Sequence, residues 1–280
     1  MMSEPKVSVL MTVYNEEETV LLTVESVLGQ TFKYFEYVIY DDGSKDRTLE
    51  ILHELEKKDK RIKVYSGGKN LGVARAVSAA AQKCAGEYIA VIDAGDLCNP
   101  ARLEKQAGFL DKNPDVYIVG CYHHWIDRRG NIINSYEFPT DVKKLKGHIF
   151  GFGAVAAHPC LMIRKSLFDK TGSYDSSLKT SMDYELYLRT LSLGFYISNV
   201  PEYLVLVLRR GEGISLSKNK QIFRDMFRLR LRYLPGMFSL KNCLYTFLSF
   251  FLILAPGSLL KKVVTSSVWS KKLRKVAIKV

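Results

Sequence analysis

The first 120 residues alternate short apolar runs with amphipathic stretches, and this alternation constrains the fold more than any other feature of the chain. The runs rich in Val, Ile and Tyr predict buried strands at Val7–Val13, Phe35–Tyr40, Ile62–Tyr65, Tyr88–Ile92 and Val116–Cys121. The stretches between them predict helices at Glu17–Leu28, Asp46–Lys58, Val73–Cys84 and Arg102–Asn113. Because each connection can hold a crossover helix, we expect an α/β fold with a mostly parallel sheet flanked by helices.

The second half of the chain is less regular. Two runs around Arg128-Arg129-Gly130-Asn131 favour a hairpin, and Asp183–Leu193 has the spacing of an amphipathic helix. Tyr196–Val200 and Tyr203–Leu208 predict two strands separated by Pro201. Beyond Ser217 the pattern is helical, basic and aliphatic.

Composition and charge divide the chain into two parts. With 280 residues, of which 47% are hydrophobic and 25% charged, the chain is neither disordered nor collagen-like. Residues 216–280 hold 14 Lys or Arg and one acid, whereas residues 1–215 hold 27 bases and 28 acids. We therefore expect a neutral domain at 1–215 and a basic, apolar helical tail at 216–280.

The cysteines and the first residues bear on the compartment. The five cysteines are far apart and include no CxxC pair, which argues against a disulfide framework or a zinc ribbon and favours a reducing compartment. The apolar run Val7–Val13 is too short for the core of a signal peptide. We therefore expect the body of the protein not to be exported.

Acidic and polar residues follow three of the predicted strands. These strand ends read Thr12-Val13-Tyr14-Asn15-Glu16, Asp41-Asp42-Gly43-Ser44 and Asp93-Ala94-Gly95-Asp96. In an open parallel sheet, ligands bind outside the carboxyl ends of the strands, so these side chains should share one crevice. Crowded carboxylates raise one another's pKa unless a cation or a hydrogen-bond donor compensates them, and a divalent metal with a polyphosphate would do so. A single Asp of this kind can equally be a turn or cap residue.

The same segments carry a resemblance to a known family. The segments Val7–Glu17, Ser26–Thr31, Val38–Asp46, Asn70–Gly72 and Gly86–Ala90 resemble, in order, the first half of the family 2 (GT-A fold) glycosyltransferases. Three later segments resemble the second half of that family: His158–Lys165, Gly172–Asp175 and Met182–Arg189. The collinear resemblance covers roughly residues 6–215 and implies a nucleotide-sugar-dependent enzyme.

The resemblance also implies roles for individual residues. Thr12, Tyr14, Glu16, Asp42 and Arg75 would hold the nucleotide sugar, with Tyr14 stacking on the base. Asp93 would contact both the nucleotide sugar and a divalent cation, either Mg²⁺ or Mn²⁺, and Asp183 would be the general base. A positioned cation stabilises the charge that develops on the departing diphosphate, and a carboxylate can take the proton of the acceptor hydroxyl. Such a single-displacement reaction inverts the anomeric carbon.

One position departs from the family pattern. The family usually has a carboxylate where this chain has Gly95, which offers no ligand atom. We expect Asp96, together with Asp93, to take over the cation. The alternative is that cation binding is weakened or lost, and Gly95 is the best argument for a second hypothesis, a non-catalytic relative that binds nucleotide or a partner.

The tail suggests a membrane surface. Residues 242–260 contain no charge and lie between Lys241 and the pair Lys261-Lys262, with Pro256-Gly257 interrupting the apolar run. A span needs about 20 apolar residues, so we favour an in-plane or re-entrant helix on the anionic cytoplasmic leaflet over a true span or a buried core helix. A long Phe/Leu run fits poorly with nucleic-acid binding.

The sequence therefore predicts an inverting glycosyltransferase on the cytoplasmic side of the cell membrane, peripheral or re-entrant. The donor would be a nucleotide-diphosphate sugar, and the acceptor a glycan or lipid-linked molecule in polysaccharide or glycolipid synthesis.

Overall fold

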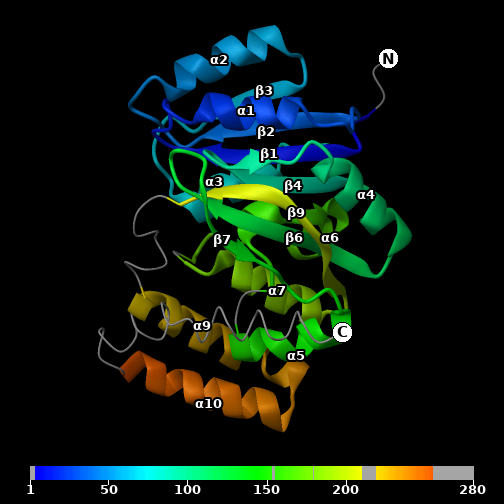
Figure 1. Cartoon of the computed structure of the whole chain (residues 1–280). Helices are drawn as coiled ribbons and strands as arrows, with labels where there is room; N and C mark the ends of the chain where they lie inside the picture. Colours follow the sequence, from blue (N-terminus) through cyan, green and yellow to red (C-terminus); the bar gives the residue numbers. More distant parts are fainter. Residues whose placement is uncertain (1–3, 153–154, 179, 210–218, 255–280) are drawn as a thin grey trace.

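The computed structural model describes residues 4–152, 155–178, 180–209 and 219–254. Nine strands of this part of the chain form one sheet in the order β3-β2-β1-β4-β8-β6-β9-β5, with β7 paired to the outside of β6 (Figure 1). The strands are β1 (Val7–Val13), β2 (Phe35–Asp41), β3 (Ile62–Ser66), β4 (Tyr88–Asp93), β5 (Leu97–Cys98), β6 (Val116–Ile126), β7 (Ile132–Tyr136), β8 (Met162–Arg164) and β9 (Tyr196–Leu208).

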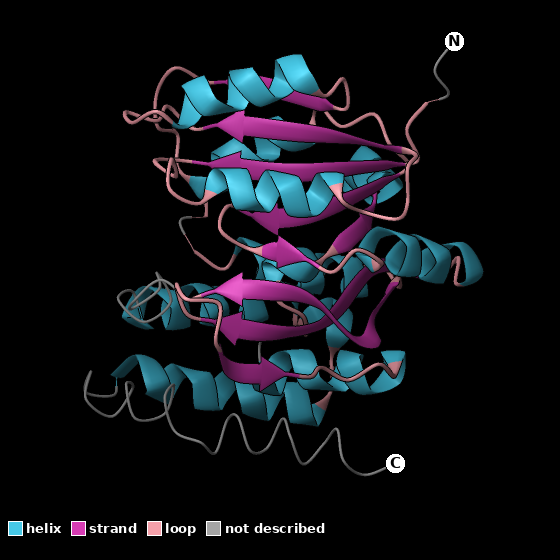
Figure 2. Ribbon diagram, turned by 45° about the horizontal axis from the view of Figure 1, so that its top comes forward, coloured by secondary structure: helices cyan, strands magenta, loops and turns pink. Residues whose placement is uncertain are grey.

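Helices cover both faces of the sheet (Figure 2). The helices of the described part are α1 (Val20–Leu28), α2 (Thr48–Lys58), α3 (Val73–Ala81), α4 (Arg102–Lys112), α5 (Val142–Phe152), α6 (Lys165–Thr171), α7 (Met182–Ser192), α9 (Asn219–Tyr233) and α10 (Leu240–Leu254). Short 3-10 turns lie at His158–Cys160 and Pro235–Met237. The five strands and four helices expected in the first 120 residues are all present.

The β3-β2-β1-β4 half of the sheet is parallel, as its alternation with helices predicts. Thr12 of β1 lies between Tyr40 of β2 and Asp93 of β4 in the register. The strands of this half therefore end together, and the polar segments that follow β1, β2 and β4 lie along one edge.

The expectation of a mostly parallel sheet is wrong for the other half, which is mixed. Strand β8 is antiparallel to both β4 and β6, and β5 and β7 are antiparallel additions, while β6 and β9 are parallel. Strand β8 has only three residues and β5 two, so neither gives a periodic signal that sequence patterns can reveal.

Pro201 does not separate two strands, as the sequence analysis expected. Strand β9 runs through it for 13 residues, and its pairing with β6 skips from Val200 opposite Cys121 to Tyr203 opposite Tyr122. Proline has no N–H for the ladder, so the chain accommodates it at this irregularity rather than by ending the strand.

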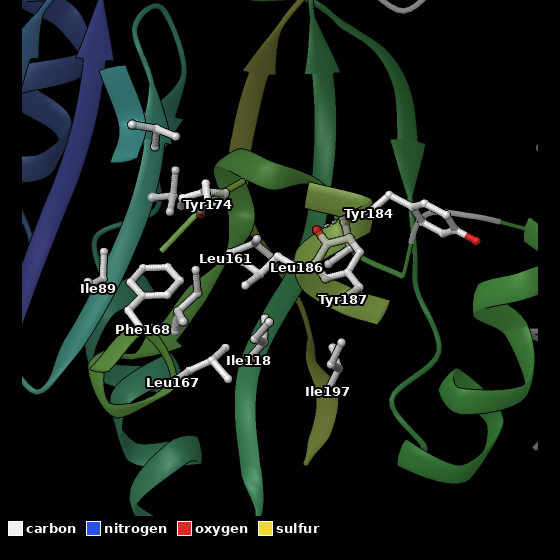
Figure 3. Close-up of a cluster of buried hydrophobic side chains, with 14 of the residues drawn as sticks. Ile89, Ile118, Leu161, Leu167, Phe168, Tyr174, Tyr184, Leu186, Tyr187 and Ile197 are labelled. Atoms are coloured by element: carbon white, nitrogen blue, oxygen red, sulfur yellow. Dashed lines mark hydrogen bonds between the residues drawn. The ribbon is translucent and has the colours of Figure 1, made fainter. Parts of the chain in front are cut away.

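Two hydrophobic clusters hold the layers together. One lies between the sheet and helices α1, α2 and α4, with Val24, Leu52 and Leu103 at its centre. The other joins the opposite face to α3, α5, α6 and α7, and Figure 3 shows part of it, with Ile118 and Leu186 fully buried.

The described part of the C-terminal region packs against the body. Leu229 of α9 belongs to the second cluster, Asp225 accepts a hydrogen bond from Thr180 (2.6 Å), and Arg230 donates to the hydroxyl of Tyr184 (3.0 Å). Helix α10 lies beside α9 at the end of the molecule farthest from α2 (Figure 1). Among the described helices, none has the length and apolar character needed to cross a membrane. The predicted tail residues 255–280 lie outside the described part.

Candidate active site

The candidate site lies along the edge where β1, β2 and β4 end. Thr12 is half-buried in β1, and Tyr14, just beyond the strand, exposes 42% of its surface. Asp93 closes β4 with its side chain 54% exposed. An exposed aromatic ring and an accessible carboxylate on adjacent strand ends can stack on a base and reach a polar ligand.

Asp42 performs a structural task at this edge. Its side chain is buried and accepts hydrogen bonds from the N–H groups of Leu71 (2.7 Å) and Gly72 (3.0 Å). These bonds fix the loop that leads into α3, where Arg75 lies exposed in the first turn. Asp42 thus holds the segment that carries Arg75 against the end of β2.

The turn after β1 is fastened to the segment before α2. Asn15 has φ +56°, and its side-chain oxygen accepts from the N–H of Lys45 (2.8 Å). The N–H of Glu16 donates to the hydroxyl of Thr48 (2.7 Å). Glu16 and Gly95 line a hollow of about 580 Å³ that the β6–β7 hairpin and the start of α1 complete. Asp42, Asp93 and Asp183 do not line this hollow.

A buried histidine connects Asp93 with the second half of the chain. Nδ1 of His158 lies 3.8 Å from Oδ1 of Asp93, and Nε2 lies 3.2 Å from the hydroxyl of Tyr174. Burial acts to lower the pKa of His158, but Asp93 and then Asp183 outweigh it, so the pKa is raised. Burial, and next the charges of Asp183 and Asp93, raise the pKa of Tyr174.

The charge of Asp183 also acts on His158 and Tyr174, although 90 residues separate Asp183 from Asp93 in the chain. Asp183 is half-buried in the first turn of α7, and its Oδ1 accepts from the N–H of Tyr184 (2.8 Å). Ser181, at the N-cap, has φ +60°, a left-handed conformation that turns the chain abruptly into the helix.

The residues around Gly95 supply few donor atoms for a cation. Gly95 has φ +94° and no ligand atom, and the carboxylate of Asp96 is buried with Oδ1 accepting from the N–H of Leu208 (2.8 Å). Burial, and then the charge of Asp93, raise the pKa of Asp96 well above its ordinary value. In the described residues, no three His, Cys, Asp or Glu side chains are grouped to hold a metal ion.

The structure thus brings Asp93 to His158, with Thr12, Tyr14 and Asp42 at the adjoining strand ends. Arg75 lies in the first turn of α3, and the charge of Asp183 acts on His158 from the first turn of α7. His158 and Tyr174 lie within segments that resemble the family, but no sequence pattern assigned either residue a role. Only their place in these segments could have singled them out. A lone His or Tyr next to an apolar run is most often a core residue, so the residue type alone did not indicate a functional role. Tyr174 does lie within the buried cluster of Figure 3.

Replacing His158 with glutamine should lower kcat by about 10- to 100-fold, because it removes the ring that separates and orients Asp93 and Tyr174. Steady-state kinetics and a melting curve would check this. His53→Gln, on the outer face of α2, is the matched control. A His158→Gln variant with normal kcat would show that the contact is only structural.

The comparisons with known proteins agree with this architecture. The family model described as "Glycosyl transferase family 2" matches residues 8–172, and the chain belongs to this family. It is 28% identical to an uncharacterized glycosyltransferase of Methanocaldococcus jannaschii over 93% of both chains. It is 31% identical to the putative glycosyltransferase EpsE of Bacillus subtilis, covering 82% of this chain and 85% of that one. With the amylovoran biosynthesis glycosyltransferase AmsE of Erwinia amylovora it shares 27% identity, covering 80% and 85%.

Solved structures share the fold. Residues 1–349 of S. aureus TarS, in complex with UDP-GlcNAc, superpose with a TM-score of 0.66 at 22% identity, covering 81% of this chain and 66% of that chain. The mannosyltransferase PcManGT of Pyrobaculum calidifontis, in complex with GDP-Man and Mn²⁺, gives 0.64 at 14% identity, covering 97% and 83%. The chain is thus a glycosyltransferase with the GT-A fold.

Proposed function

We propose that the protein transfers a sugar, with inversion, from a nucleotide-diphosphate sugar to a glycan or lipid-linked acceptor at the cytoplasmic face of the cell membrane. The observation that supports the proposal is the contact of His158 with Asp93 (3.8 Å), together with the charge of Asp183 that helps to raise the pKa of His158, in a chain of glycosyltransferase family 2. One carboxylate then lies at the donor edge of the sheet and the other on the helix that faces it.

The donor would bind along the ends of β1, β2 and β4. Tyr14 would stack on the base, and Thr12 and Asp42 would shape its pocket. Arg75 would donate to the phosphates. The exposure of Tyr14 and Arg75 supports these roles, as do the TarS and PcManGT structures, which hold UDP-GlcNAc and GDP-Man. Glu16, in the turn fastened to Thr48, would contact the sugar end of the donor.

Asp183 would act as the general base. A carboxylate takes the proton of the acceptor hydroxyl as that oxygen attacks the anomeric carbon, while the bond to the diphosphate breaks on the opposite face. One base is sufficient for this single displacement, which inverts the anomeric carbon. The hydrogen bond from the N–H of Tyr184 holds the Asp183 side chain in place at the start of α7 for this purpose.

A divalent cation, Mg²⁺ or Mn²⁺, would be held by Asp93 together with phosphate oxygens of the donor, and when bound it would supply a Lewis acid. The Mn²⁺ in the PcManGT complex supports this proposal. Oδ1 of Asp96 accepts from the N–H of Leu208 and Oδ2 is buried, so Asp96 would have to become accessible to join as a ligand, and its predicted role needs a direct test.

Titrating Mn²⁺ in the presence of nucleotide, with Asp93→Asn and Asp96→Asn, would make that test. We expect Asp93→Asn to weaken Mn²⁺-dependent nucleotide binding about tenfold or more, because it removes the accessible carboxylate. Asp96→Asn should lower the melting temperature and leave the Mn²⁺ dependence unchanged, because its carboxylate is engaged inside the fold. A tenfold loss of Mn²⁺ affinity in Asp96→Asn would instead establish Asp96 as a ligand.

The membrane and acceptor parts of the proposal rest on the tail. Residues 216–280 carry 14 bases and one acid, and such a segment is attracted to anionic lipid. The relation to AmsE, named for amylovoran biosynthesis, supports a polysaccharide or lipid-linked acceptor. In-plane or re-entrant attachment is the form we propose.

A donor screen tests the function as a whole. A panel of UDP-, GDP- and dTDP-sugars should include one that raises the melting temperature, since a ligand that binds only the folded state stabilises it. That donor should then be turned over, with the sugar released to water or passed to an acceptor lipid. Stabilisation without any turnover would favour the second hypothesis, a non-catalytic relative, for which Gly95 is the specific argument.

A further inference from the structure

Helix α10 has its polar side against the protein and its apolar side toward the solvent. Its sides that face the protein carry Asn242, Thr246 and Ser249, each of which is almost fully buried. Its outward side is apolar, with exposed fractions between 42% and 84%. The residues of this outer face are Leu240, Leu244, Phe247, Leu248, Phe250, Phe251 and Leu254.

The buried polar side chains of α10 all donate hydrogen bonds to backbone carbonyls. Asn242 donates through Nδ2 to the carbonyl of Met237 (2.7 Å), Thr246 donates to the carbonyl of Asn242 (2.8 Å), and Ser249 donates to that of Thr246 (2.6 Å). Tyr245, on the flank, packs so closely on Gly151 of α5 that a Cβ there would lie 3.0 Å from its ring. The bonds of Thr246 and Ser249 lie within α10, whereas Asn242 and Tyr245 join the helix to Met237 and Gly151 and leave its apolar side outward.

A row of exposed arginines lies on α9, the helix that packs beside α10. Arg224, Arg228 and Arg232 are exposed on α9 at four-residue intervals, which places them along one side of that helix. Arg232 lies 3.5 Å from Asp175, whereas no acid of the described residues forms an ion pair with Arg224 or Arg228. Asp225 is buried and bonded to Thr180, so this acid does not neutralise the row. Phe227 of α9 contacts Phe250 of α10 with ring centroids 5.6 Å apart, so the helix that carries the arginines packs directly against α10.

We propose that the outer face of α10, with the arginine row of α9, docks on an anionic lipid bilayer with α10 lying in its plane. Aromatic and leucine side chains enter the boundary of the acyl chains, while arginines reach lipid phosphates from beside them. The described helix has 15 residues and is about 22 Å long, shorter than the roughly 30 Å hydrocarbon core, and its polar side packs against the protein, so this face would dock with the helix lying in the surface.

The positive charge of this surface favours an anionic lipid bilayer over a second copy of the chain as its binding partner. A symmetric pair uses the same patch on both molecules, which would bring two arginine rows into one interface. An anionic bilayer offers an apolar interior and negative headgroups at once. This inference deepens the proposed membrane attachment by naming the surface, and vesicle binding is measured without donor or acceptor. A chain that failed to bind vesicles would therefore contradict this inference and leave the proposed sugar transfer unaffected.

Co-sedimentation of the full chain with vesicles tests the assignment. The vesicles are phosphatidylcholine alone or phosphatidylcholine mixed with phosphatidylglycerol. We expect binding to the mixed vesicles, and a loss of affinity of about tenfold or more in Phe247→Ser/Phe251→Ser, because two exposed aromatic anchors are removed. Arg224→Gln/Arg228→Gln should bind mixed vesicles about tenfold more weakly.

Matched controls use the same chemistry elsewhere on the surface. Ile132→Ser/Ile133→Ser on β7 and Lys57→Gln/Lys58→Gln on α2 change exposed residues far from α10 and should bind as the unaltered chain does. Unchanged binding in both α10 and α9 variants would overturn the assignment of this face. A dimer in analytical ultracentrifugation that Phe247→Ser/Phe251→Ser dissociates, with no binding to mixed vesicles, would also overturn it in favour of a second copy.

Discussion

Asp183→Asn is expected to lower the turnover of a bound nucleotide sugar by about 10²–10⁴-fold while leaving its dissociation constant within about twofold. Asparagine keeps the size of the side chain and its acceptance of the N–H of Tyr184, but it cannot take a proton from the acceptor hydroxyl. The effect should therefore fall on kcat. Single-turnover kinetics, together with donor binding measured by calorimetry, would separate the two quantities.

Asp169→Asn is the matched control for this prediction, because Asp169 is an exposed acid on α6. Its turnover should equal that of the unaltered chain. If Asp183→Asn retained full kcat, Asp183 would not be the base. Sugar transfer would then have to be assigned to another carboxylate near His158, of which Asp93 is the candidate.

The parallel half of the fold could be predicted because its signals are local. The strand Val7–Val13 has the same bounds in the sequence-based prediction and in the structure. A short run of Val and Leu that ends in polar residues indicates a buried strand in a helix-covered sheet. The reversal of β8 could not be predicted. Its three residues contact β4 and β6 through partners more than 40 positions away, and no local pattern records such pairings.

The candidate site shows the same division. Asp42 and Asp93 follow strands that are visible in the sequence, so their convergence on one edge followed from strand order alone. The approach of His158 to Asp93 depends on β8 lying antiparallel beside β4, a pairing that the sequence did not reveal. The burial of Asp96 likewise depends on the N–H of Leu208 in β9, 112 residues away.

Arg102 links these two halves behind the site. Its side chain is fully buried, and its guanidinium donates to the carbonyls of Val91 (2.7 Å) and Leu161 (3.3 Å) and to Gln106 (3.0 Å). The positive charge also acts to lower the pKa of the buried Asp96 carboxyl, against the larger effect of burial. One side chain thus fastens β4, which ends in Asp93, to the segment that follows His158.

Arg102→Met should destabilise the protein by about 3–5 kcal/mol, because methionine fills similar space but leaves buried acceptors without a donor and Asp96 without its compensating charge. At a few degrees per kcal/mol, the melting temperature should fall by roughly 10 °C. Arg47→Met, an exposed arginine of an i,i+3 pair with Glu50, should change stability by less than about 0.5 kcal/mol. Chemical denaturation of both variants measures the difference. Equal stability of the two would mean that the polar network around Arg102 contributes nothing beyond packing, and that β4 and the His158 segment are held together by their apolar contacts alone.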